Sequence, residues 1–357
     1  MRDDLAVPHP VIPVLDRLAA DGREPGAAVY VVRNGSVEVE HQVGTRDGRT
    51  AWTTDTLVMT YSVAKPFAAL TLLTAVADGH LALDQAVVEL WPEYAAHRKG
   101  ATTVRQVLSH QAGLPSFPLE AADLEFDDAE GLTDLLAGAR PEHAPGAAVA
   151  EHALTYGHLC ERLLRAATGE DLPTRFARIA GDHGWDLHLR VPDADLGRVA
   201  DVVPVAPDWP SSYLDDPRWG PALSRPSGLL DPTVLNSDRW RRCSFGAIGL
   251  HGTARALATF YDDLLRPDGG VARLLGTELH QQYVGAQATG IDLVLGREVT
   301  WTLGFQVEPD EIGMGGAGGC SAWFSTRGGY AAAYVTRGLG GGDRAEEVWQ
   351  VLENLPG

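Results

Sequence analysis

The chain has 357 residues, of which 45% are apolar and 22% are charged, so global disorder is excluded. Its 48 acidic residues outnumber 29 basic ones, and the net charge of −19 argues against nucleic-acid or anionic membrane partners. A chain of this length can bury a large core in one or two domains.

The first third of the chain predicts a helix, a hairpin and a second helix. Val11–Ala20 has helical spacing of its apolar residues. Ala27–Arg33 and Val37–Val43 are rich in β-formers, and Asn34-Gly35 between them is a strong hairpin signal. Ser62–Asp78 is rich in alanine and leucine and ends before a glycine, which predicts a helix.

The middle of the chain alternates helical pieces with long connections that contain proline. Val104–Ser109 and Tyr156–Ala167 have helical patterns. Pro204–Pro232 is too rich in proline for regular helices or central strands. We expect this stretch to be a rigid surface excursion that walls a pocket.

Regular structure is predicted again after Cys243. Thr253–Leu265 is predicted to be an amphipathic helix. Three strands are predicted next, at Trp301–Val307, Cys320–Ser325 and Ala331–Arg337, and a last helix at Arg344–Leu355. Strands at both ends with helices between them predict an α+β fold, in which both chain termini build one sheet. We expect residues 1–80 and 241–357 to form the sheet domain, and residues 81–240 to form a helical, loop-rich inserted domain.

The strongest chemical signal is Ser62-Val63-Ala64-Lys65. A serine at a helix start and a lysine three residues later share one helix face, and the helix N-terminus favours an alkoxide. An enclosed lysine can lose its proton and act as a general base, whereas arginine cannot. Lysine occurs only at positions 65 and 99, which makes a chance lysine in this tetrapeptide less expected. The alternative is a serine that caps the helix and a lysine that is solvated. Lys99, in a segment that looks exposed, has no such role.

The surrounding sequence resembles the serine β-lactamase and penicillin-binding superfamily, and within it most closely the class C β-lactamases and the family VIII esterases and transacylases. Tyr61–Phe67 resembles the nucleophile motif. Further segments follow the family's order and spacing, namely Leu81–Asp84, Trp91–Glu93, Thr103–Pro115, Gly252–Arg255 and Leu303–Phe305. The resemblance covers most of the chain and implies a β-lactamase-like fold, with Ser62 as nucleophile and Lys65 as its base.

The second motif of the family departs from its usual form. The resemblance places a Tyr-x-Asn about five residues after Pro145-Gly146, where this chain has Glu151-His152-Ala153. Glu151 therefore stands at the position of the tyrosine, and could hold a proton on Lys65 or act as a general base. A local shift that brings Tyr156 into the site is the second possibility, and a Tyr156 that only packs on its helix is the third.

The third motif is also altered. In Gly313–Gly319, Met314 stands where the family has a Lys or His that binds a β-lactam carboxylate. The resemblance implies an oxyanion hole from the backbone N–H groups of Ser62 and Ala317, and substrate contacts at Gly315 and Gly316. The segment also matches GxGxxG, but a strand rather than a helix follows it, so we do not expect a dinucleotide.

Other polar and aromatic residues give weaker signals. Trp209, Tyr213 and Trp219 in the proline-rich excursion, with Trp240, are candidates to line an acyl or acceptor pocket, with ordinary packing as the alternative. The histidines show no metal spacing, so we expect no metal and no organic cofactor, and a structural role for His110. The three separated cysteines favour buried thiols in a reducing compartment.

These patterns predict an acyl-transfer enzyme that works through an acyl-serine, with a small-molecule ester, thioester or amide as donor. Water as acceptor makes it an esterase, and an alcohol or amine makes it a transacylase, with a role in secondary metabolism as one setting. The N-terminal sequence has no export pattern and no apolar run long enough for a membrane span, so we expect a cytoplasmic protein. The altered motifs leave a catalytically silent binding protein as the alternative, and the oligomeric state is open.

Overall fold

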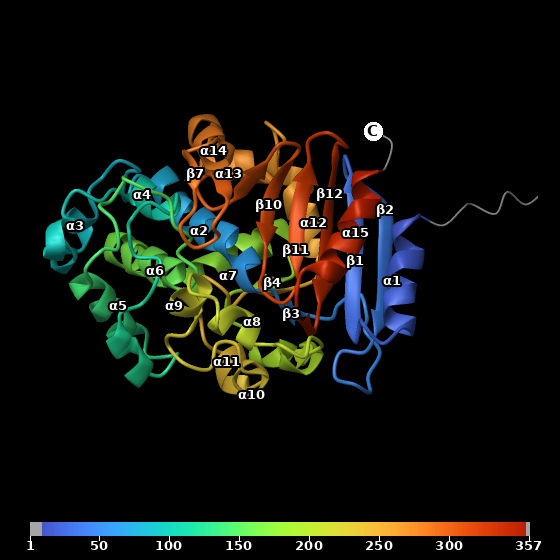
Figure 1. The fold of residues 1–357 in the computed structure, drawn as a ribbon. Coiled ribbons are helices and arrows are strands. Elements are labelled where there is room, and N and C mark those ends of the chain that lie inside the picture. Colours follow the sequence, from blue (N-terminus) through green and yellow to red (C-terminus); the bar gives the residue numbers. More distant parts are fainter. Residues whose placement is uncertain (1–8, 355–357) are drawn as a thin grey trace, which may run out of the picture.

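The computed structural model describes residues 9–354 and has one antiparallel sheet of eight strands at its centre (Figure 1). The strand order is β2-β1-β12-β11-β10-β9-β8-β7. The strands are β1 (Gly26–Arg33), β2 (Ser36–Gly44), β7 (Ala288–Ile291), β8 (Glu298–Trp301), β9 (Gln306–Glu308), β10 (Glu311–Gly315), β11 (Ser321–Ser325) and β12 (Tyr330–Thr336). The pairing of β1 with β12 joins the two ends of the chain, which confirms the predicted α+β fold.

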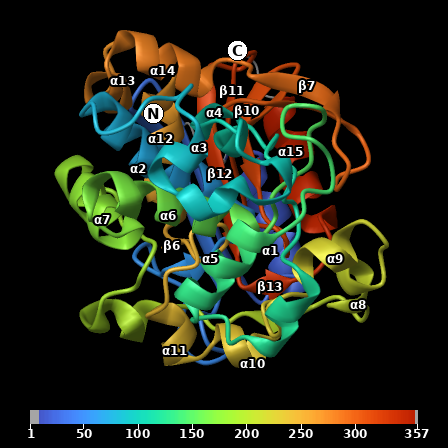
Figure 2. The same cartoon turned by 90° about the vertical axis from the view of Figure 1, so that its left-hand side faces the viewer.

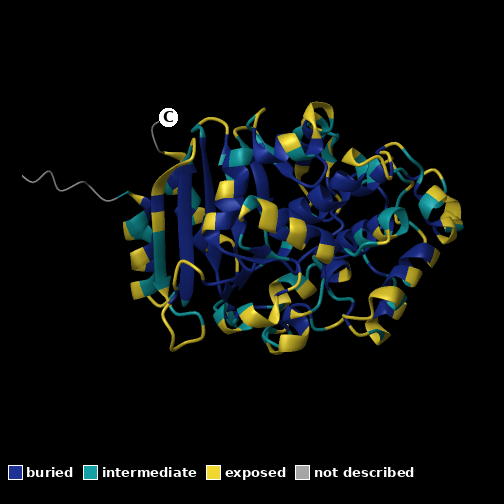
Figure 3. Ribbon diagram, turned by 180° about the vertical axis from the view of Figure 1, so that it is seen from behind, coloured by how far each residue is buried: buried dark blue, intermediate teal, exposed yellow. Residues whose placement is uncertain are grey.

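Helices cover both faces of this sheet, so its central strands are buried on both sides. The face that carries Val29 and Val31 packs against α1 (Val11–Ala20) and α15 (Asp343–Glu353). The face that carries Tyr30 and Val32 belongs to the main core with α2 (Lys65–Ala77) and α12 (Ala254–Leu264). Two covered faces explain why β1 and β12 are nearly continuous apolar runs rather than alternating ones. Figure 3 shows buried strands behind helices whose outer faces are exposed.

The remaining helices gather beside the sheet, on the side away from α1 (Figures 1 and 2). They are α3 (Val87–Leu90), α4 (Val104–Leu108), α5 (Ala129–Gly138), α6 (Thr155–Thr168), α7 (Leu172–His183), α8 (Ser211–Leu214), α9 (Trp219–Leu223), α10 (Pro232–Leu235), α11 (Asp238–Arg241), α13 (Gly270–Leu275) and α14 (Thr277–Val284). The described residues also contain the 3₁₀ helices η1 (Tyr61–Ala64), η2 (Pro92–Arg98), η3 (Leu119–Asp123) and η4 (Asp193–Arg198). Short strand pairs join β3 (Val58–Met59) to β6 (His251–Gly252), β6 to β4 (Leu187–His188), and β5 (Val203–Pro204) to β13 (Gly338–Leu339). One hydrophobic core runs through α2, α7 and α12, and the division at residues 80 and 240 stays a prediction.

Most of the predicted elements are present, with local corrections. Trp301–Val307 is not one strand: it contains the turn of a hairpin, because Thr302 N donates to Phe305 O and Gly304 has a φ of +124°. Pro204–Pro232, predicted to hold no regular helix, contains the short helices α8 and α9 and reaches α10. The predicted end of the last helix at Leu355 and the N-terminal residues 1–8 lie outside the described residues. Within the described part of the chain, no helix has the length and apolar character that a bilayer crossing requires.

Lys99 is buried, contrary to the expected exposure. Its side chain is inaccessible to solvent, and Nζ donates to the carbonyls of Ala96 and Ala137, each at 3.1 Å, and to that of Ala139. Burial lowers the pKa of Lys99 to about 8. The lysine therefore ties η2 to the end of α5, a contact between distant segments that the local sequence does not reveal.

Candidate active site

Ser62 lies in η1, directly after a strained residue. Tyr61 has a φ of +50°, which a bulky residue adopts only when its surroundings enforce it. Its hydroxyl donates to Leu229 O at 3.3 Å, and Thr60 N donates to Leu250 O at 2.9 Å. These contacts hold the turn that presents the partly exposed Ser62 at the start of the continuous η1–α2 segment.

Three side chains meet at this turn. Lys65 Nζ lies 2.6 Å from Ser62 Oγ and 2.9 Å from Glu151 Oε1. Ser62 Oγ also donates to Glu151 Oε1, at a longer 3.5 Å. Lys65 is fully buried and the Glu151 side chain is 3% exposed, so the pair is shielded from water while the serine is not.

Burial and the neighbouring carboxylate act in opposite directions on Lys65. Burial lowers the pKa of Lys65 below its ordinary value, and the charge and hydrogen bond of Glu151 limit that decrease. A lysine with a lowered pKa reaches its neutral, proton-accepting form more readily. The serine that would deliver the proton is already within hydrogen-bond distance.

The segment that carries Glu151 is fixed by its backbone. Glu151 N donates to the buried Asp292 Oδ1 at 3.1 Å, and Asp292 Oδ2 accepts from Trp301 Nε1 at 3.0 Å. On the other side, His110 O accepts from Ala150 N, and His110 Nδ1 accepts from His152 N, both at 3.0 Å. Asp292 was not expected from the sequence, because it lies in a loop without a motif and contacts Glu151 only after folding.

Tyr156, the alternative to Glu151, points elsewhere. It lies in the first turn of α6, its hydroxyl donates to Leu108 O at 3.1 Å, and its ring stacks on His110 at 4.8 Å. Burial raises the pKa of Tyr156 well above its usual value. Of the two candidates, the geometry brings Glu151 to Ser62 and Lys65, while the contacts of Tyr156 belong to the packing of its helix.

The glycine-rich segment lies against the other side of the Ser62 turn. A side chain at Gly316 would overlap the Thr60 carbonyl and touch Tyr61, so only glycine permits this approach. Gly319 N donates to Gly316 O at 3.2 Å, which leaves Ala317 at the corner of a tight turn. In the described part of the chain, no protein group accepts a hydrogen bond from the backbone N–H of Ala317 or of Ser62. Gly315 and Gly316 are partly exposed beside this turn.

A comparison with known families shows to which family this chain belongs. The family model described as "Beta-lactamase" matches residues 12–355. This chain belongs to the β-lactamase family. The fold described above agrees with its solved structures, for example a penicillin-binding protein homologue from Caulobacter crescentus, with a TM-score of 0.80, 30% identity and 96% coverage of both chains.

Esterases are among the relatives of this β-lactamase-family chain. A family VIII carboxylesterase of known structure matches with a TM-score of 0.81 and 27% identity, over 96% of this chain and 95% of the other. The esterase/β-lactamase LipL of Mycobacterium tuberculosis is 36% identical over 180 residues, which is 49% of this chain and 41% of LipL. Esterase EstB of Burkholderia gladioli is 33% identical over 120 residues, or 32% of this chain and 31% of EstB. These matches therefore span less than half of either curated relative.

The aromatic residues of Pro204–Pro232 form a chain of ring contacts that begins at Tyr61, the residue before Ser62. The ring centroids of Tyr61 and Trp209 are 6.2 Å apart, those of Trp209 and Tyr213 5.5 Å, and those of Tyr213 and Trp219 5.9 Å. Trp209 is buried and donates to Leu230 O, whereas Tyr213 and Trp219 are partly exposed. Burial and the charge of Glu151 raise the pKa of Tyr213, and a hydrogen bond from the Gly318 backbone opposes them. Tyr213 packs between Trp209 and Trp219, while Trp240 is buried against Phe126 and Phe245.

Met314, which stands in place of the family's cationic residue, is buried. It packs with Val149, Val299 and Trp301 in a small apolar cluster. The side chain of Met314 carries no formal charge.

Proposed function

We propose that this chain is a serine esterase that acts on small ester substrates through an acyl-Ser62 intermediate. The observation that carries the proposal is the arrangement of Ser62, Lys65 and Glu151, with Lys65 Nζ within 2.9 Å of both oxygen partners. A nucleophile beside a buried base, itself oriented by a third group, is the general pattern of covalent catalysis.

Acylation begins with attack of Ser62 Oγ on the ester carbonyl carbon. The hydroxyl proton passes to the neutral amine of Lys65, and the carbonyl π electrons move to the oxygen. The N–H groups of Ser62 and Ala317 donate to this oxyanion. When the tetrahedral intermediate collapses, the bond to the alkoxy group breaks, and the leaving alcohol takes the proton from Lys65.

Deacylation uses a second nucleophile, which Glu151 activates. Its carboxylate accepts a proton from water while the oxygen attacks the acyl-serine, and the carboxylic acid is released as Ser62 regains its proton through Lys65. An alcohol or an amine in place of water makes the same step a transfer to that acceptor. The tyrosine of the family is not needed in this scheme, because Glu151 stands at its place.

The expected substrates are neutral esters with an apolar portion. Met314 supplies no positive charge for a substrate carboxylate, which disfavours β-lactams and peptide C-termini. The partly exposed rings of Tyr213 and Trp219 provide apolar surface for an acyl or alcohol group. The esterases among the relatives support the ester class.

Labelling with a serine-directed fluorophosphonate tests the proposal. We expect the wild type to gain one label, detected by intact mass, and Ser62→Ala to gain none. Hydrolysis of p-nitrophenyl esters should follow the same pattern. A wild type that neither labels nor hydrolyses these esters would support a silent binding protein, to which the altered second and third motifs point.

Product analysis separates hydrolysis from transfer. The enzyme is given a p-nitrophenyl ester with and without an added alcohol or amine. Formation of a new ester or amide, with the release of p-nitrophenol maintained, supports transfer. If no acceptor diverts the acyl group from water, the transfer reaction is excluded for those acceptors.

A further inference from the structure

The turn that carries Ala317 has little intrinsic rigidity. Gly313–Gly315 are held in β10 by pairing with β11, but three of the four residues that follow, Gly316–Gly319, are glycines, which have the largest conformational freedom of all residues. An oxyanion hole requires its donors to be held in place before the reaction, so this turn needs an external constraint. Among the described residues, the backbone–backbone hydrogen bonds of Gly316–Gly319 are Gly316 N to Cys320 O at 2.7 Å and Gly319 N to Gly316 O at 3.2 Å.

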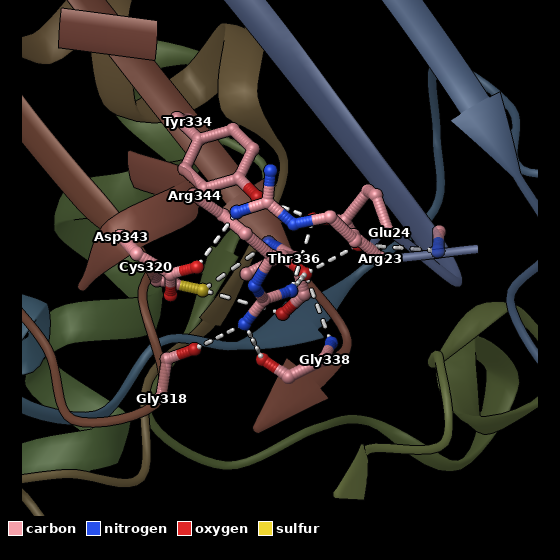
Figure 4. A network of polar contacts seen from close by, with 10 residues as sticks. Arg23, Glu24, Gly318, Cys320, Tyr334, Thr336, Gly338, Asp343 and Arg344 are labelled. Atoms are coloured by element: carbon pink, nitrogen blue, oxygen red, sulfur yellow. Dashed lines mark hydrogen bonds and ion pairs between the residues drawn. The ribbon is translucent and has the colours of Figure 1, made fainter. Parts of the chain in front are cut away.

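The side chain of Arg344 supplies a further constraint (Figure 4). This residue lies in the first turn of α15, and its side chain is 3% exposed. Nη2 donates to Gly318 O at 3.0 Å and to Gly338 O at 2.7 Å. The guanidinium therefore links the glycine-rich turn to β13, directly after the central strand β12.

Glu24 orients this guanidinium from the opposite side. Glu24 Oε2 accepts from Arg344 Nη1 at 3.1 Å and from the Tyr334 hydroxyl, and Oε1 accepts from Thr336 Oγ1 at 2.7 Å. Burial raises the pKa of Glu24, and the charge of Arg344 opposes this rise. The planar fork of an arginine can hold one carboxylate and two carbonyls at once, which the single ammonium of a lysine cannot do with the same geometry.

A buried ion pair is by itself weak evidence for a contribution to stability, because well-packed apolar residues in its place often give a fold that is equally stable or more stable. One contact of Arg344 suggests a role besides stability, because Nη2 donates to the carbonyl of Gly318, the residue that follows Ala317. We propose that Arg344, oriented by Glu24, is a positioning residue that holds the Gly316–Gly319 turn so that the Ala317 N–H points at the reacting oxygen. This inference rests on the proposed function of Ser62 and Ala317.

The test compares a double variant with a matched control. The double variant Glu24→Gln with Arg344→Met removes the guanidinium and also the carboxylate, so no buried charge is left unpaired. The control Tyr334→Phe removes the hydrogen bond from the Tyr334 hydroxyl to Glu24 and keeps the one from Arg344 to Gly318 O. The measurements are the fluorophosphonate labelling rate per folded molecule, kcat and KM for a p-nitrophenyl ester, and thermal unfolding.

We expect the double variant to lose about 10- to 100-fold in kcat and in labelling rate, with KM changed little, because an oxyanion donor acts mainly in the transition state. Tyr334→Phe should keep the wild-type rates even where its melting temperature falls. If the double variant does not fold, Arg344→Lys replaces it; this variant keeps the charge opposite Glu24 and should still lower kcat.

The outcomes separate the two proposals. A wild type that does not label overturns the proposed function, and this inference with it. A labelled wild type beside a folded double variant, or a folded Arg344→Lys, with wild-type rates overturns the inference alone. An equal loss of kcat per folded molecule in Tyr334→Phe also overturns it, because that variant keeps the hydrogen bond from Arg344 to Gly318 O and the loss would then not depend on this bond.

Discussion

The carboxylate of Glu151 lies 2.9 Å from the amine of Lys65, and both groups are buried. In a dry environment two opposite charges at this distance attract strongly, yet each of them has lost its hydration. Transfer of one proton from the lysine to the carboxylate would give a neutral pair at the same distance. The pair can therefore offer either an amine or a carboxylate as a base, according to which step of an acyl transfer is under way.

Replacing Lys65 with arginine tests whether this residue must lose its proton. We expect Lys65→Arg to lower the fluorophosphonate labelling rate at least about 100-fold, as fully as Lys65→Ala, because a guanidinium stays protonated. Thermal unfolding identifies the folded fraction of each variant. Labelling of Lys65→Arg near the wild-type rate would mean that the site needs only a positive charge.

Glu151→Gln separates the two halves of the reaction. Glutamine keeps the size of the side chain but cannot take a proton, so we expect turnover of a p-nitrophenyl ester to fall about 100-fold or more. Acylation still has Lys65 as its base, so the acyl-enzyme should accumulate and be visible by intact mass. Full turnover in this variant would remove Glu151 from deacylation.

Tyr156→Phe is the matched control for that experiment. The change removes the hydrogen bond to Leu108 O and keeps the stacking on His110, so it should cost about 1 kcal/mol of the free energy of unfolding. The turnover per folded molecule should remain near that of the wild type. A large loss of kcat without accumulated acyl-enzyme would instead place Tyr156 in the proton transfers.

The sequence predicts Ser62 as the nucleophile but leaves its partner beside Lys65 open. Ser62 and Lys65 are three residues apart on one helical segment, so local geometry alone brings them together. Glu151 is 89 residues from Ser62, and its position depends on the backbone contacts of Ala150–His152 with His110 and Asp292. No local pattern encodes those contacts, which is why the choice between Glu151 and Tyr156 required the fold.

The same distinction explains the rest of the fold. The hairpin at Asn34-Gly35 was predictable, because both residues adopt the positive φ that such a turn requires, +50° and +78°. The strand expected at Trp301–Val307 is broken at Gly304. A side chain at this position would collide with Ala69 and contact the Tyr156 hydroxyl. A turn that depends on its own residues can be predicted from the sequence. A glycine that is required because a distant helix packs against it cannot.

The pH dependence of acylation tests the effect of the buried carboxylate on Lys65. The labelling rate should rise with pH as Lys65 loses its proton, and burial, which lowers this pKa, makes the rise complete at a lower pH than for an exposed lysine. Glu151 raises the pKa of Lys65, so Glu151→Gln should shift the midpoint of the rise to lower pH. The labelling rate of both proteins is measured across the neutral and alkaline range. An unchanged midpoint, or a shift to higher pH, would contradict the coupling between the two groups.

Lys99 provides the last test, because it is the second of only two lysines and is also buried. Its amine donates to three backbone carbonyls, two of them at the end of α5. Lys99→Met keeps most of the apolar stem but leaves these carbonyls without that donor, and an unsatisfied buried acceptor costs about 1–3 kcal/mol. We therefore expect the free energy of unfolding, measured with urea, to fall by roughly 2–4 kcal/mol. The labelling rate per folded molecule should equal that of the wild type, since none of the partners of Lys99 contacts Ser62 or Glu151. A slower labelling rate in folded Lys99→Met would show that both lysines serve the reaction, and that burial alone does not distinguish a structural amine from a catalytic one.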